Sequence, residues 1–342
     1  MTTEPHIALL KKVVLGGTLD AAESAVVFGA IMQGKVHESE LAAFLTAQTV
    51  RKPTVAEIIG AARAMRAAMT TVPAPALAID LCGTGGDGKG TLNISTAVSI
   101  VVAACGVPVA KHGNRNMSSK TGAADVLEAL GVKIDIPPET ARLCLDETGV
   151  CFLFAQTYHP AMKHVAAVRR ALGIRTIFNL LGPLCNPAGT MRQLLGVFAQ
   201  EWLEPLAYVL KALGSEKVWI VHGRDGLDEV TITDITFVAA LENGLVTTRR
   251  ISPEDAGLPR ATLDDIKGGA AAENADAIRR LLDGEQGPYR DIVLFNAAAA
   301  LAVSDRAADL RDGVEIAAKV IDSGAAGHVL QHLIAVSNGA PR

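Results

Sequence analysis

The sequence has few cysteines, no long apolar run and no excess of basic charge. Its five cysteines form no Cys-x-x-Cys pair, so neither a zinc site nor a disulfide framework is expected, and buried, reduced thiols are the simpler interpretation. The longest apolar stretch, residues 97–110, contains Gly106 and Pro108 and falls short of the roughly 20 residues that span a bilayer. The N-terminus also lacks a signal-peptide pattern. We therefore expect a cytoplasmic protein with no membrane partner.

The overall charge excludes a further class of partner. A formal net charge of −4 provides no global basic field to hold nucleic acid. Aromatic residues make up only 4% of the chain, whereas hydrophobic residues reach 49% and charged residues 20%, which fits a helix-rich α/β enzyme. With 342 residues, the chain is long enough for a sizeable core and for two domains.

The distribution of apolar residues predicts two kinds of structure. The first seventy residues predict helices only, one of them opened by a capping box from Thr54 to Glu57. After Pro73 and Pro75, short apolar runs alternate with helical segments, which indicates parallel strands joined by crossover helices. We predict strands at residues 78–81, 107–110, 151–154, 218–221 and 235–241, a hairpin turn at Asn243-Gly244, and helices from residue 274 onward.

One segment departs from this alternation. Residues 159–189 contain a helix and a turn rich in Gly and Pro but no strand pattern, so they are expected to rejoin the N-terminal helices. The predicted fold is α/β: a small all-helical domain plus a larger α/β domain with a mostly parallel central sheet flanked by helices. The helical domain would comprise residues 1–72 and about 160–188, and the α/β domain residues 73–159 and about 189–342.

Acidic residues are absent between Asp87 and Asp125, and this gap holds two glycine-rich turns, at residues 83–90 and 111–115. The first turn follows an apolar run and precedes a predicted helix that opens near Asn93. Backbone N–H groups and the positive end of a helix dipole would then converge on one spot, which is how phosphates are commonly held. We therefore predict a local anion site.

The first turn matches known phosphate motifs only in part. The spacing Gly83-x-Gly85-x-x-Gly88 fits a dinucleotide-binding pattern, but no acidic residue follows about 20 positions later to hold a ribose. The turn also nearly fits a P-loop, yet Gly90 stands where Ser or Thr would bind magnesium. A purely structural turn remains an alternative.

Further polar residues favour binding over a structural turn. Asn93, Ser95 and Thr96 could cap the next helix or hold a phosphate and its magnesium. The second turn adds cationic and hydroxyl donors at Lys111, His112, Asn114, Arg115, Ser118, Ser119 and Lys120, although a solvated loop is the alternative.

Two charged features lie further along the chain. Asp228 and Glu229 follow a predicted strand and form either an exposed loop or a pair of oxygen ligands for magnesium. Arg169 lies on a predicted helix, as a surface ion-pair partner or as the cation for a substrate carboxylate.

These residues together resemble the anthranilate phosphoribosyltransferase family, over nearly the whole chain. The motifs that carry the resemblance are Gly83-Thr-Gly-Gly-Asp87, Asn93-Ile-Ser-Thr96, Lys111-His-Gly-Asn-Arg115, Ser118-Ser-Lys-Thr-Gly122, Ala124-Asp-Val-Leu-Glu-Ala-Leu-Gly131, Tyr158-His-Pro-Ala-Met162, Arg169, Gly173-Ile-Arg-Thr-Ile-Phe-Asn179, Leu181-Gly-Pro-Leu184 and Asp228-Glu229. Asn116-Met117 and the segment from Arg51 to Thr54 depart from the usual pattern without touching an expected ligand.

The resemblance implies an enzyme of tryptophan biosynthesis, a magnesium-dependent homodimer associated through its helical domain. It would transfer the phosphoribosyl group of 5-phosphoribosyl 1-diphosphate (PRPP) to anthranilate, with magnesium, two ions per subunit, in the cleft between the domains.

The resemblance also implies the residues of the site. PRPP would be held by Gly83, Gly86, Asp87, Thr91, Asn93, Ile94, Ser95, Thr96, Lys111, His112, Gly113, Asn114, Arg115, Ser118, Ser119 and Ala123. Anthranilate would meet Gly83, Asn114, His159, Arg169 and Gly182, and magnesium would meet Ser95, Asp228 and Glu229. Lys111, Arg169, Asp228 and Glu229 would be the catalytic residues, with His112 as a possible proton relay.

Two rival functions share this fold. A nucleic-acid-binding relative without transferase activity would need a basic face, which the net charge of −4 does not favour. The pyrimidine nucleoside phosphorylases differ at the second turn and carry an additional C-terminal domain, for which 342 residues leave no room.

Overall fold

The computed structural model describes residues 5–115 and 121–339. The four N-terminal helices are α1 (Pro5–Val14), α2 (Ala21–Met32), α3 (Glu38–Arg51) and α4 (Val55–Ala67). At the start of α4, the Thr54 hydroxyl accepts a hydrogen bond from Glu57 N while the Glu57 side chain accepts one from Thr54 N. The predicted capping box is therefore confirmed, and no strand occurs among the described residues before Ile79.

The remainder of the chain alternates strands with helices and ends in helices. The strands are β1 (Ile79–Gly83), β2 (Val109–Gly113), β3 (Val150–Phe154), β4 (Arg192–Gly196), β5 (Lys217–Gly223), β6 (Thr236–Glu242) and β7 (Leu245–Ile251). The α-helices are α5 (Ile94–Ala104), α6 (Ala123–Leu130), α7 (Pro138–Thr148), α8 (Ala155–Tyr158), α9 (Lys163–Leu172), α10 (Phe178–Leu184), α11 (Leu203–Ala212), α12 (Ala271–Leu282), α13 (Pro288–Val303), α14 (Leu310–Asp322) and α15 (Ala325–Ser337). Short 3-10 helices span Pro160–Met162, Gln200–Trp202, Pro253–Ala256 and Leu263–Ile266. The predicted fold class is confirmed.

All seven strands form one sheet in the order β3-β2-β1-β4-β5-β6-β7. The first five strands in this order pair in parallel, whereas β6 and β7 pair antiparallel as the predicted hairpin. Asn243 and Gly244 at its tip both have positive φ angles, 51° and 73°, as a type I′ turn requires. The sequence analysis missed β4, an interior strand that opens with two polar residues, Arg192 and Gln193, of which Gln193 is buried.

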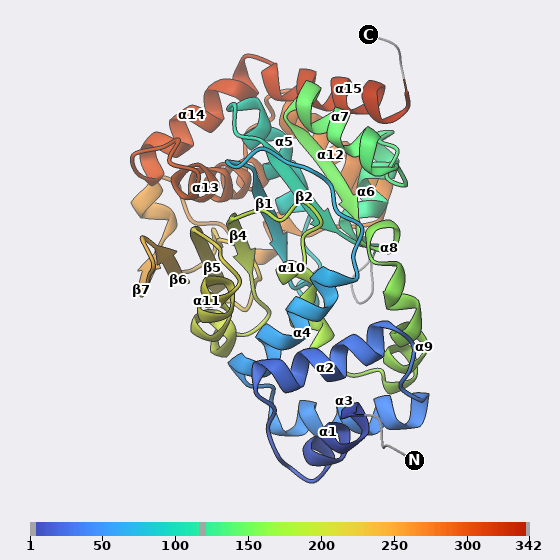
Figure 1. Cartoon of the computed structure of the whole chain (residues 1–342). Helices are drawn as coiled ribbons and strands as arrows, with labels where there is room; N and C mark the ends of the chain where they lie inside the picture. The colour runs from blue at the N-terminus through green and yellow to red at the C-terminus, as the bar shows by residue number, and fades with distance from the viewer. Residues whose placement is uncertain (1–4, 116–120, 340–342) are drawn as a thin grey trace.

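The two faces of the sheet are covered by different parts of the chain (Figure 1). On one face, α5, α7, α13 and α15 pack around the apolar core of the α/β domain. On the other, α11 lies on β5 and β6, and a second buried cluster runs from these strands into α1–α4. No helix among residues 5–115 and 121–339 is long and apolar enough to cross a membrane.

Helices α9 and α10 return to the N-terminal helices, although they follow β3 in the sequence. Helix α9 contacts α2 and α3, and α10 contacts α4, and Figure 1 shows α9 beside the N-terminal helices. Val165 and Phe178 are buried in the same cluster as Phe28 and Phe44. This packing supports our proposal of a discontinuous helical domain, residues 1–72 with about 160–188.

Candidate active site

The predicted anion site lies at β1, from which the following strands in the chain are added first toward one edge of the sheet (β2, β3) and then toward the other (β4, β5). Strand β1 pairs with β2 on one side and with β4 on the other, and ligands of open α/β sheets commonly bind at the carboxyl ends of strands at such a point. Gly83 ends β1 and Gly196 ends β4, paired in register. The glycine-rich turn follows Gly83, with positive φ at Gly85, Gly86, Gly88 and Gly90, a conformation that favours glycine.

Asp228 is packed against both strand ends. A Cβ atom on Gly83 would lie 2.5 Å from Asp228 Oδ2, and one on Gly196 would lie 1.6 Å from the Asp228 carbonyl oxygen. Gly85 N donates a 2.8 Å hydrogen bond to Asp228 Oδ2. Glycine is therefore required at 83 and 196 because Asp228 approaches the backbone closely, and Gly196 is a site residue that the sequence analysis did not find.

The carboxyl groups of Asp228 and Glu229 are held in a setting that disfavours their charge. Burial, followed by the nearby charges of Asp87 and Glu229, raises the pKa of Asp228 well above its ordinary value. Burial and Asp87 raise the pKa of Glu229 to about 7, although Lys111 and hydrogen bonds from Ser95 oppose this rise. Two neighbouring carboxylates with one cation beside them are a suitable setting for a divalent metal.

Lys111 lies inside the site rather than in a solvated loop. It belongs to β2, because strand pairing with β3 places Lys111 opposite Phe152, so β2 extends further than the predicted residues 107–110. The Lys111 ammonium is buried and donates hydrogen bonds to the Leu81 carbonyl oxygen (2.5 Å) and the Ser95 hydroxyl (3.1 Å). The structure therefore brings together three predicted residues, Lys111, Ser95 and Glu229.

Asn93 is also fixed at the start of α5, although its side chain does not cap the helix. Its Oδ1 accepts a 2.8 Å hydrogen bond from Asn274 Nδ2, and its carbonyl oxygen accepts one of 3.3 Å from the Tyr289 hydroxyl. The Thr96 hydroxyl oxygen is buried without a hydrogen-bond partner among the described residues. The Asn93 oxygens are therefore engaged with distant residues rather than with the helix start, whereas the Thr96 hydroxyl has no such partner in the described ranges.

Two buried histidines lie on the other side of the site. The ring centroids of His112 and His159 are 5.0 Å apart, and His112 Nδ1 lies 3.1 Å from the carbonyl oxygen of Gly182. Burial is the main reason that the pKa falls to about 3 for His112 and about 4 for His159. Both imidazoles are consequently neutral at physiological pH, and their Nε2 atoms are buried without hydrogen-bond partners in the described part of the chain.

Two other predicted residues, Arg169 and Arg115, contact neighbouring side chains. Arg169, on α9, stacks over Phe178 at 5.5 Å, and burial lowers its pKa. The guanidinium of Arg115 forms ion pairs with Asp125 and Glu128 of α6 instead of remaining free for an anion. Ser118 and Ser119 lie outside the described residues.

Arg175 is a second residue to which the sequence analysis gave no role. Its guanidinium donates to the carbonyl oxygen of Gly86 and lies 4.3 Å from the centre of the Phe198 ring. The Arg175 carbonyl oxygen accepts a hydrogen bond from the Thr49 hydroxyl of α3. Arg175 thus links the helical part of the molecule to the glycine-rich turn, and its position in the motif from Gly173 to Asn179 was the only indication in the sequence.

The fold and the site define a class of enzyme. Residues 7–69 match the helical bundle domain, and residues 75–327 the a/b domain, of a glycosyl transferase family, so the chain belongs to this family. Relatives that this chain resembles over nearly its whole length are anthranilate phosphoribosyltransferases. The enzyme of Rhodopseudomonas palustris (strain BisB18) is 57% identical over 333 residues, which cover 97% of this chain and 98% of the relative.

Solved structures of anthranilate phosphoribosyltransferases also resemble this chain in fold. The crystal structure of anthranilate phosphoribosyltransferase from Thermus thermophilus is 44% identical, with a TM-score of 0.92 over 97% of this chain and 99% of that one. The enzyme of Saccharomyces cerevisiae in complex with PRPP and Mg is 29% identical, with a TM-score of 0.88 over 97% and 98% of the two chains. The family predicted from the sequence motifs is therefore confirmed.

Proposed function

We infer that the chain is a magnesium-dependent pentosyltransferase that acts in tryptophan biosynthesis. It transfers the phosphoribosyl group of PRPP to the amine of anthranilate and yields N-(5-phosphoribosyl)anthranilate and diphosphate. The observation that carries this conclusion is the meeting of Lys111, Ser95 and the Asp228-Glu229 pair at the ends of β1 and β4. The similarity to anthranilate phosphoribosyltransferases over 97% of the chain supports the choice of substrates.

The proposed PRPP site is the region around the two glycine-rich segments. The turn after Gly83 offers backbone N–H groups, Asn93 and Thr96 offer polar atoms at a helix start, and Lys111 offers a fixed positive charge. The S. cerevisiae relative was solved with PRPP and Mg, which supports the same ligand here. The full set of proposed PRPP residues is the one implied by the family resemblance. It includes Arg115, whose guanidinium would have to exchange its ion pairs with Asp125 and Glu128 for the ligand.

The oxygen donors at this site fit magnesium. Asp228, Glu229 and the Ser95 hydroxyl lie together, and no group of three or more His, Cys, Asp or Glu in the described ranges could hold a metal alone. Magnesium commonly binds through one or two carboxylates and completes its coordination with substrate phosphates and water. We therefore assign it to Ser95, Asp228 and Glu229, with two ions per subunit, where it would neutralise charge on the diphosphate.

The proposed anthranilate path runs past the neutral histidines. His159 and Gly182 lie beside His112, and Asn114 follows β2. Uncharged imidazoles do not attract water or anions as imidazolium groups would, so they suit an aromatic ring. Arg169 would face the carboxylate of anthranilate. The S. cerevisiae enzyme was also solved with 4-fluoroanthranilate, which supports an aromatic site in this family.

The reaction requires alignment more than covalent catalysis. The amine nitrogen of anthranilate attacks C1 of the ribose, the C1–oxygen bond to diphosphate breaks, and the sugar carries positive charge in the transition state. The backbone N–H groups of the turn and the Lys111 ammonium would stabilise the departing diphosphate. An aromatic amine is already neutral at physiological pH, so no residue has to deprotonate it before attack.

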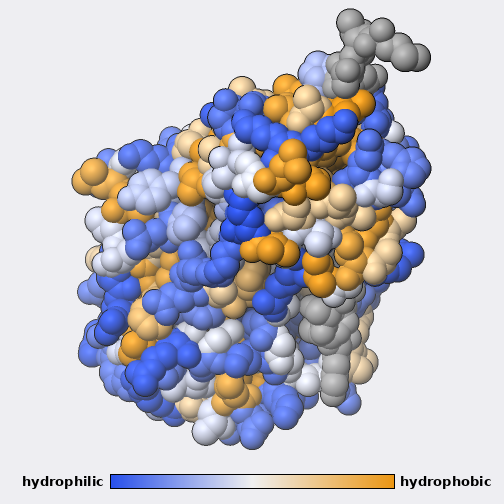
Figure 2. All heavy atoms as spheres, turned by 90° about the horizontal axis from the view of Figure 1, so that it is seen from below, coloured by the Kyte–Doolittle hydropathy of each residue, from blue (hydrophilic) through white to orange (hydrophobic). Residues whose placement is uncertain are grey.

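We also propose a cytoplasmic homodimer associated through the helical domain. Seen from the helical end, the surface carries hydrophobic patches among hydrophilic residues (Figure 2). In the helical domain, Leu15, which directly follows α1, and Val50 in α3 are apolar side chains that are 87% and 82% exposed. The five cysteines are buried and unpaired, which suits a reducing compartment. Light scattering during gel filtration would measure the subunit number.

Anthranilate fluorescence gives the direct test of the reaction. Purified protein is mixed with anthranilate and PRPP, with and without magnesium, and released diphosphate is measured in parallel. We expect magnesium-dependent loss of fluorescence with diphosphate released in equal amount. A folded protein that causes no loss would contradict the proposed reaction, and phosphate-dependent release of a free base from nucleosides would replace it with phosphorolysis.

A further inference from the structure

The loop between β5 and β6 carries Asp228 and Glu229, and its first turn is tight. Gly223 N donates to the Leu227 carbonyl oxygen, and Gly226 N donates to the Gly223 carbonyl oxygen, both at 2.8 Å. The pairing of neighbouring strands changes at this loop: β4 and β5 are parallel, whereas β5 and β6 are antiparallel. Hydrogen bonds within the loop therefore help to set its conformation.

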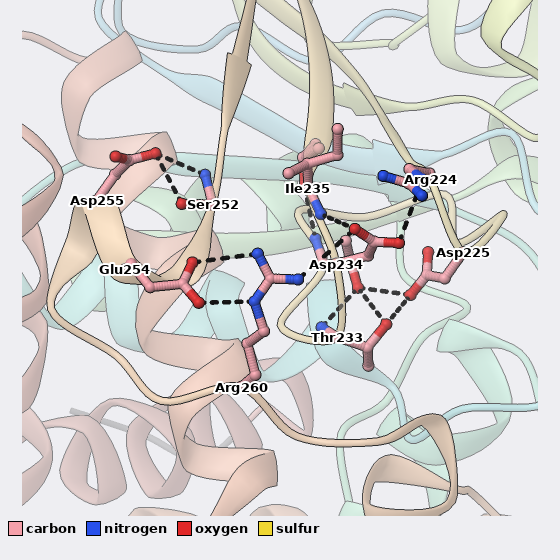
Figure 3. A network of polar contacts seen from close by, with 11 residues as sticks. Arg224, Asp225, Thr233, Asp234, Ile235, Ser252, Glu254, Asp255 and Arg260 are labelled. Atoms are coloured by element: carbon pink, nitrogen blue, oxygen red, sulfur yellow. Dashed lines mark hydrogen bonds and ion pairs between the residues drawn. The ribbon is translucent and has the colours of Figure 1, made fainter.

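Asp225 closes the loop on itself. Its Oδ1 accepts a 3.0 Å hydrogen bond from Leu227 N, and its Oδ2 accepts hydrogen bonds from the hydroxyls of Thr231 (2.6 Å) and Thr233. Figure 3 shows the Asp225 carboxylate directed at Thr233. These contacts join the two sides of the segment that contains Asp228 and Glu229. A Cβ on Gly223 would lie 2.3 Å from Asp225 Oδ1, so the glycine is needed for this approach.

A second contact fixes the residue after Glu229. The side-chain amide of Asn296, on α13, accepts a 2.9 Å hydrogen bond from Val230 N and donates one of 2.8 Å to the Val230 carbonyl oxygen. Asn296 and Val230 are buried. The Asp228-Glu229 pair is thus anchored at Leu227 on one side and at Val230 on the other, while neither anchoring side chain belongs to the pair.

Magnesium needs both carboxylates ionised, and two like charges on adjacent residues repel each other, so a flexible loop would let them separate. Groups that orient metal ligands commonly change metal affinity by about ten- to a hundredfold when removed. We propose that Asp225, through Thr231 and Thr233, is a positioning residue that holds Asp228 and Glu229 ready for magnesium. This inference rests on the proposed metal role of Asp228 and Glu229.

The same loop provides a matched control. Asp234 forms longer ion pairs with Arg224 (3.5 Å) and Arg260 (3.6 Å), and Arg260 also pairs with Glu254 at 2.6 Å. Figure 3 shows this network beside the Asp225 group. These side chains are partly exposed, and exposed ion pairs contribute little to stability. Asp234→Asn therefore changes a loop carboxylate without touching the contacts of Asp225.

The experiment compares Asp225→Asn, Thr231→Val, Thr231→Ser and Asp234→Asn with the unaltered chain. Mn²⁺ binding in the presence of PRPP is followed by electron paramagnetic resonance, and initial rates are measured across a magnesium titration. We expect Asp225→Asn and Thr231→Val to weaken Mn²⁺ binding and to raise the magnesium needed for half-maximal rate by about tenfold or more. At saturating magnesium, their kcat should approach the unaltered value.

Thr231→Ser keeps the hydroxyl that Thr231→Val removes, so its metal binding should match that of the unaltered chain. Asp234→Asn should also leave metal binding unchanged. Unchanged Mn²⁺ affinity in folded Asp225→Asn and Thr231→Val, or an equal loss in Thr231→Ser, would overturn the proposal. Glu229→Gln separates the two hypotheses. If Glu229→Gln leaves metal binding intact, the proposed metal site itself is wrong, whereas loss in Glu229→Gln without loss in Asp225→Asn contradicts only the positioning role.

Discussion

The imidazole rings of His112 and His159 lie 5.0 Å apart, and each has a buried Nε2 atom without a hydrogen-bond partner in the described part of the chain. His112 Nδ1 faces the Gly182 carbonyl oxygen at 3.1 Å, so the proton of the neutral ring belongs on Nδ1. His112 Nε2 is then a free acceptor. This geometry leaves a lone pair on His112 Nε2 that can receive the amine proton after attack.

The two histidines predict the acid sensitivity of the fold. The folded pKa of His112, about 3, lies below the ordinary value of 6.5, so the unfolded chain binds a proton first as pH falls. Stability is lost as pH decreases from about 6.5 toward 3, by about 2 kcal/mol between pH 7 and pH 5 for His112. His112→Gln should reduce this loss. The measurement is the free energy of unfolding in urea at pH 7 and at pH 5. An unchanged difference between pH 7 and pH 5 would show that His112 is not buried and neutral.

The proton relay is tested separately by kinetics. His112→Ala should lower kcat if Nε2 accepts the amine proton, because removal of a positioned proton acceptor commonly costs about a hundredfold or more. Because the pKa of His112 is about 3, its ring is neutral over the whole measured range, and kcat should fall by a similar factor at every pH. The measurement is kcat from pH 5.5 to 9 at saturating substrates. If turnover stays unchanged, the relay is wrong and the proton leaves to solvent.

The metal site predicts an opposite dependence on pH. Because the pKa of Glu229 is raised to about 7 and that of Asp228 lies well above its ordinary value, the metal-free fold loses stability as pH rises from about 4.5 to 7. Magnesium needs the ionised carboxylates, so protons compete with it in this range. We expect magnesium to raise Tm more at pH 8 than at pH 5.5. An equal shift at both pH values would place the metal elsewhere.

Much of the fold could be predicted from the sequence because its elements have strong local patterns. Asn243-Gly244 determines the hairpin turn, and the Thr54–Glu57 pair determines a helix start, without help from the rest of the chain. Strand β4 escaped prediction because Gln193 is buried through tertiary hydrogen bonds, including one of 2.8 Å to the Pro183 carbonyl oxygen. A polar residue satisfied by distant partners cannot be distinguished from an exposed one in the sequence.

The site shows the same contrast between features set by local sequence, which were predicted, and features set by contacts between distant segments, which were missed. Lys111, Ser95 and Glu229 were predicted from motifs, and the structure brings them together. Gly196 was missed because its importance arises only from the approach of Asp228, more than thirty residues later. Arg115 carries the expected charge, but Glu128 is close enough to neutralise it. Residue type was predictable, whereas pairing between distant segments required the fold.

Arg169 should affect one substrate more than the other. A charge-assisted hydrogen bond to the anthranilate carboxylate contributes about 1.5 to 3 kcal/mol, so Arg169→Ala should raise the KM for anthranilate by about ten- to a hundredfold and change the KM for PRPP much less. Arg170 is the neighbouring exposed cation on α9, and Arg170→Ala serves as the control. Equal effects of Arg169→Ala on both substrates would indicate a structural arginine.

Gly196 offers the sharpest test of the contact between β4 and the metal-binding loop. A Cβ there would lie 1.6 Å from the Asp228 carbonyl oxygen, and backbone cannot move aside as a flexible side chain can. Gly196→Ala should therefore displace Asp228, weaken magnesium-dependent activity by at least about tenfold and lower Tm. Gly29, inside α2, has no atom within 4 Å of an added Cβ, and Gly29→Ala should preserve activity and slightly raise stability through its better helix propensity. If Gly196→Ala leaves activity and Tm unchanged, Asp228 does not lie against β4, and the site must be assembled differently from the arrangement described above.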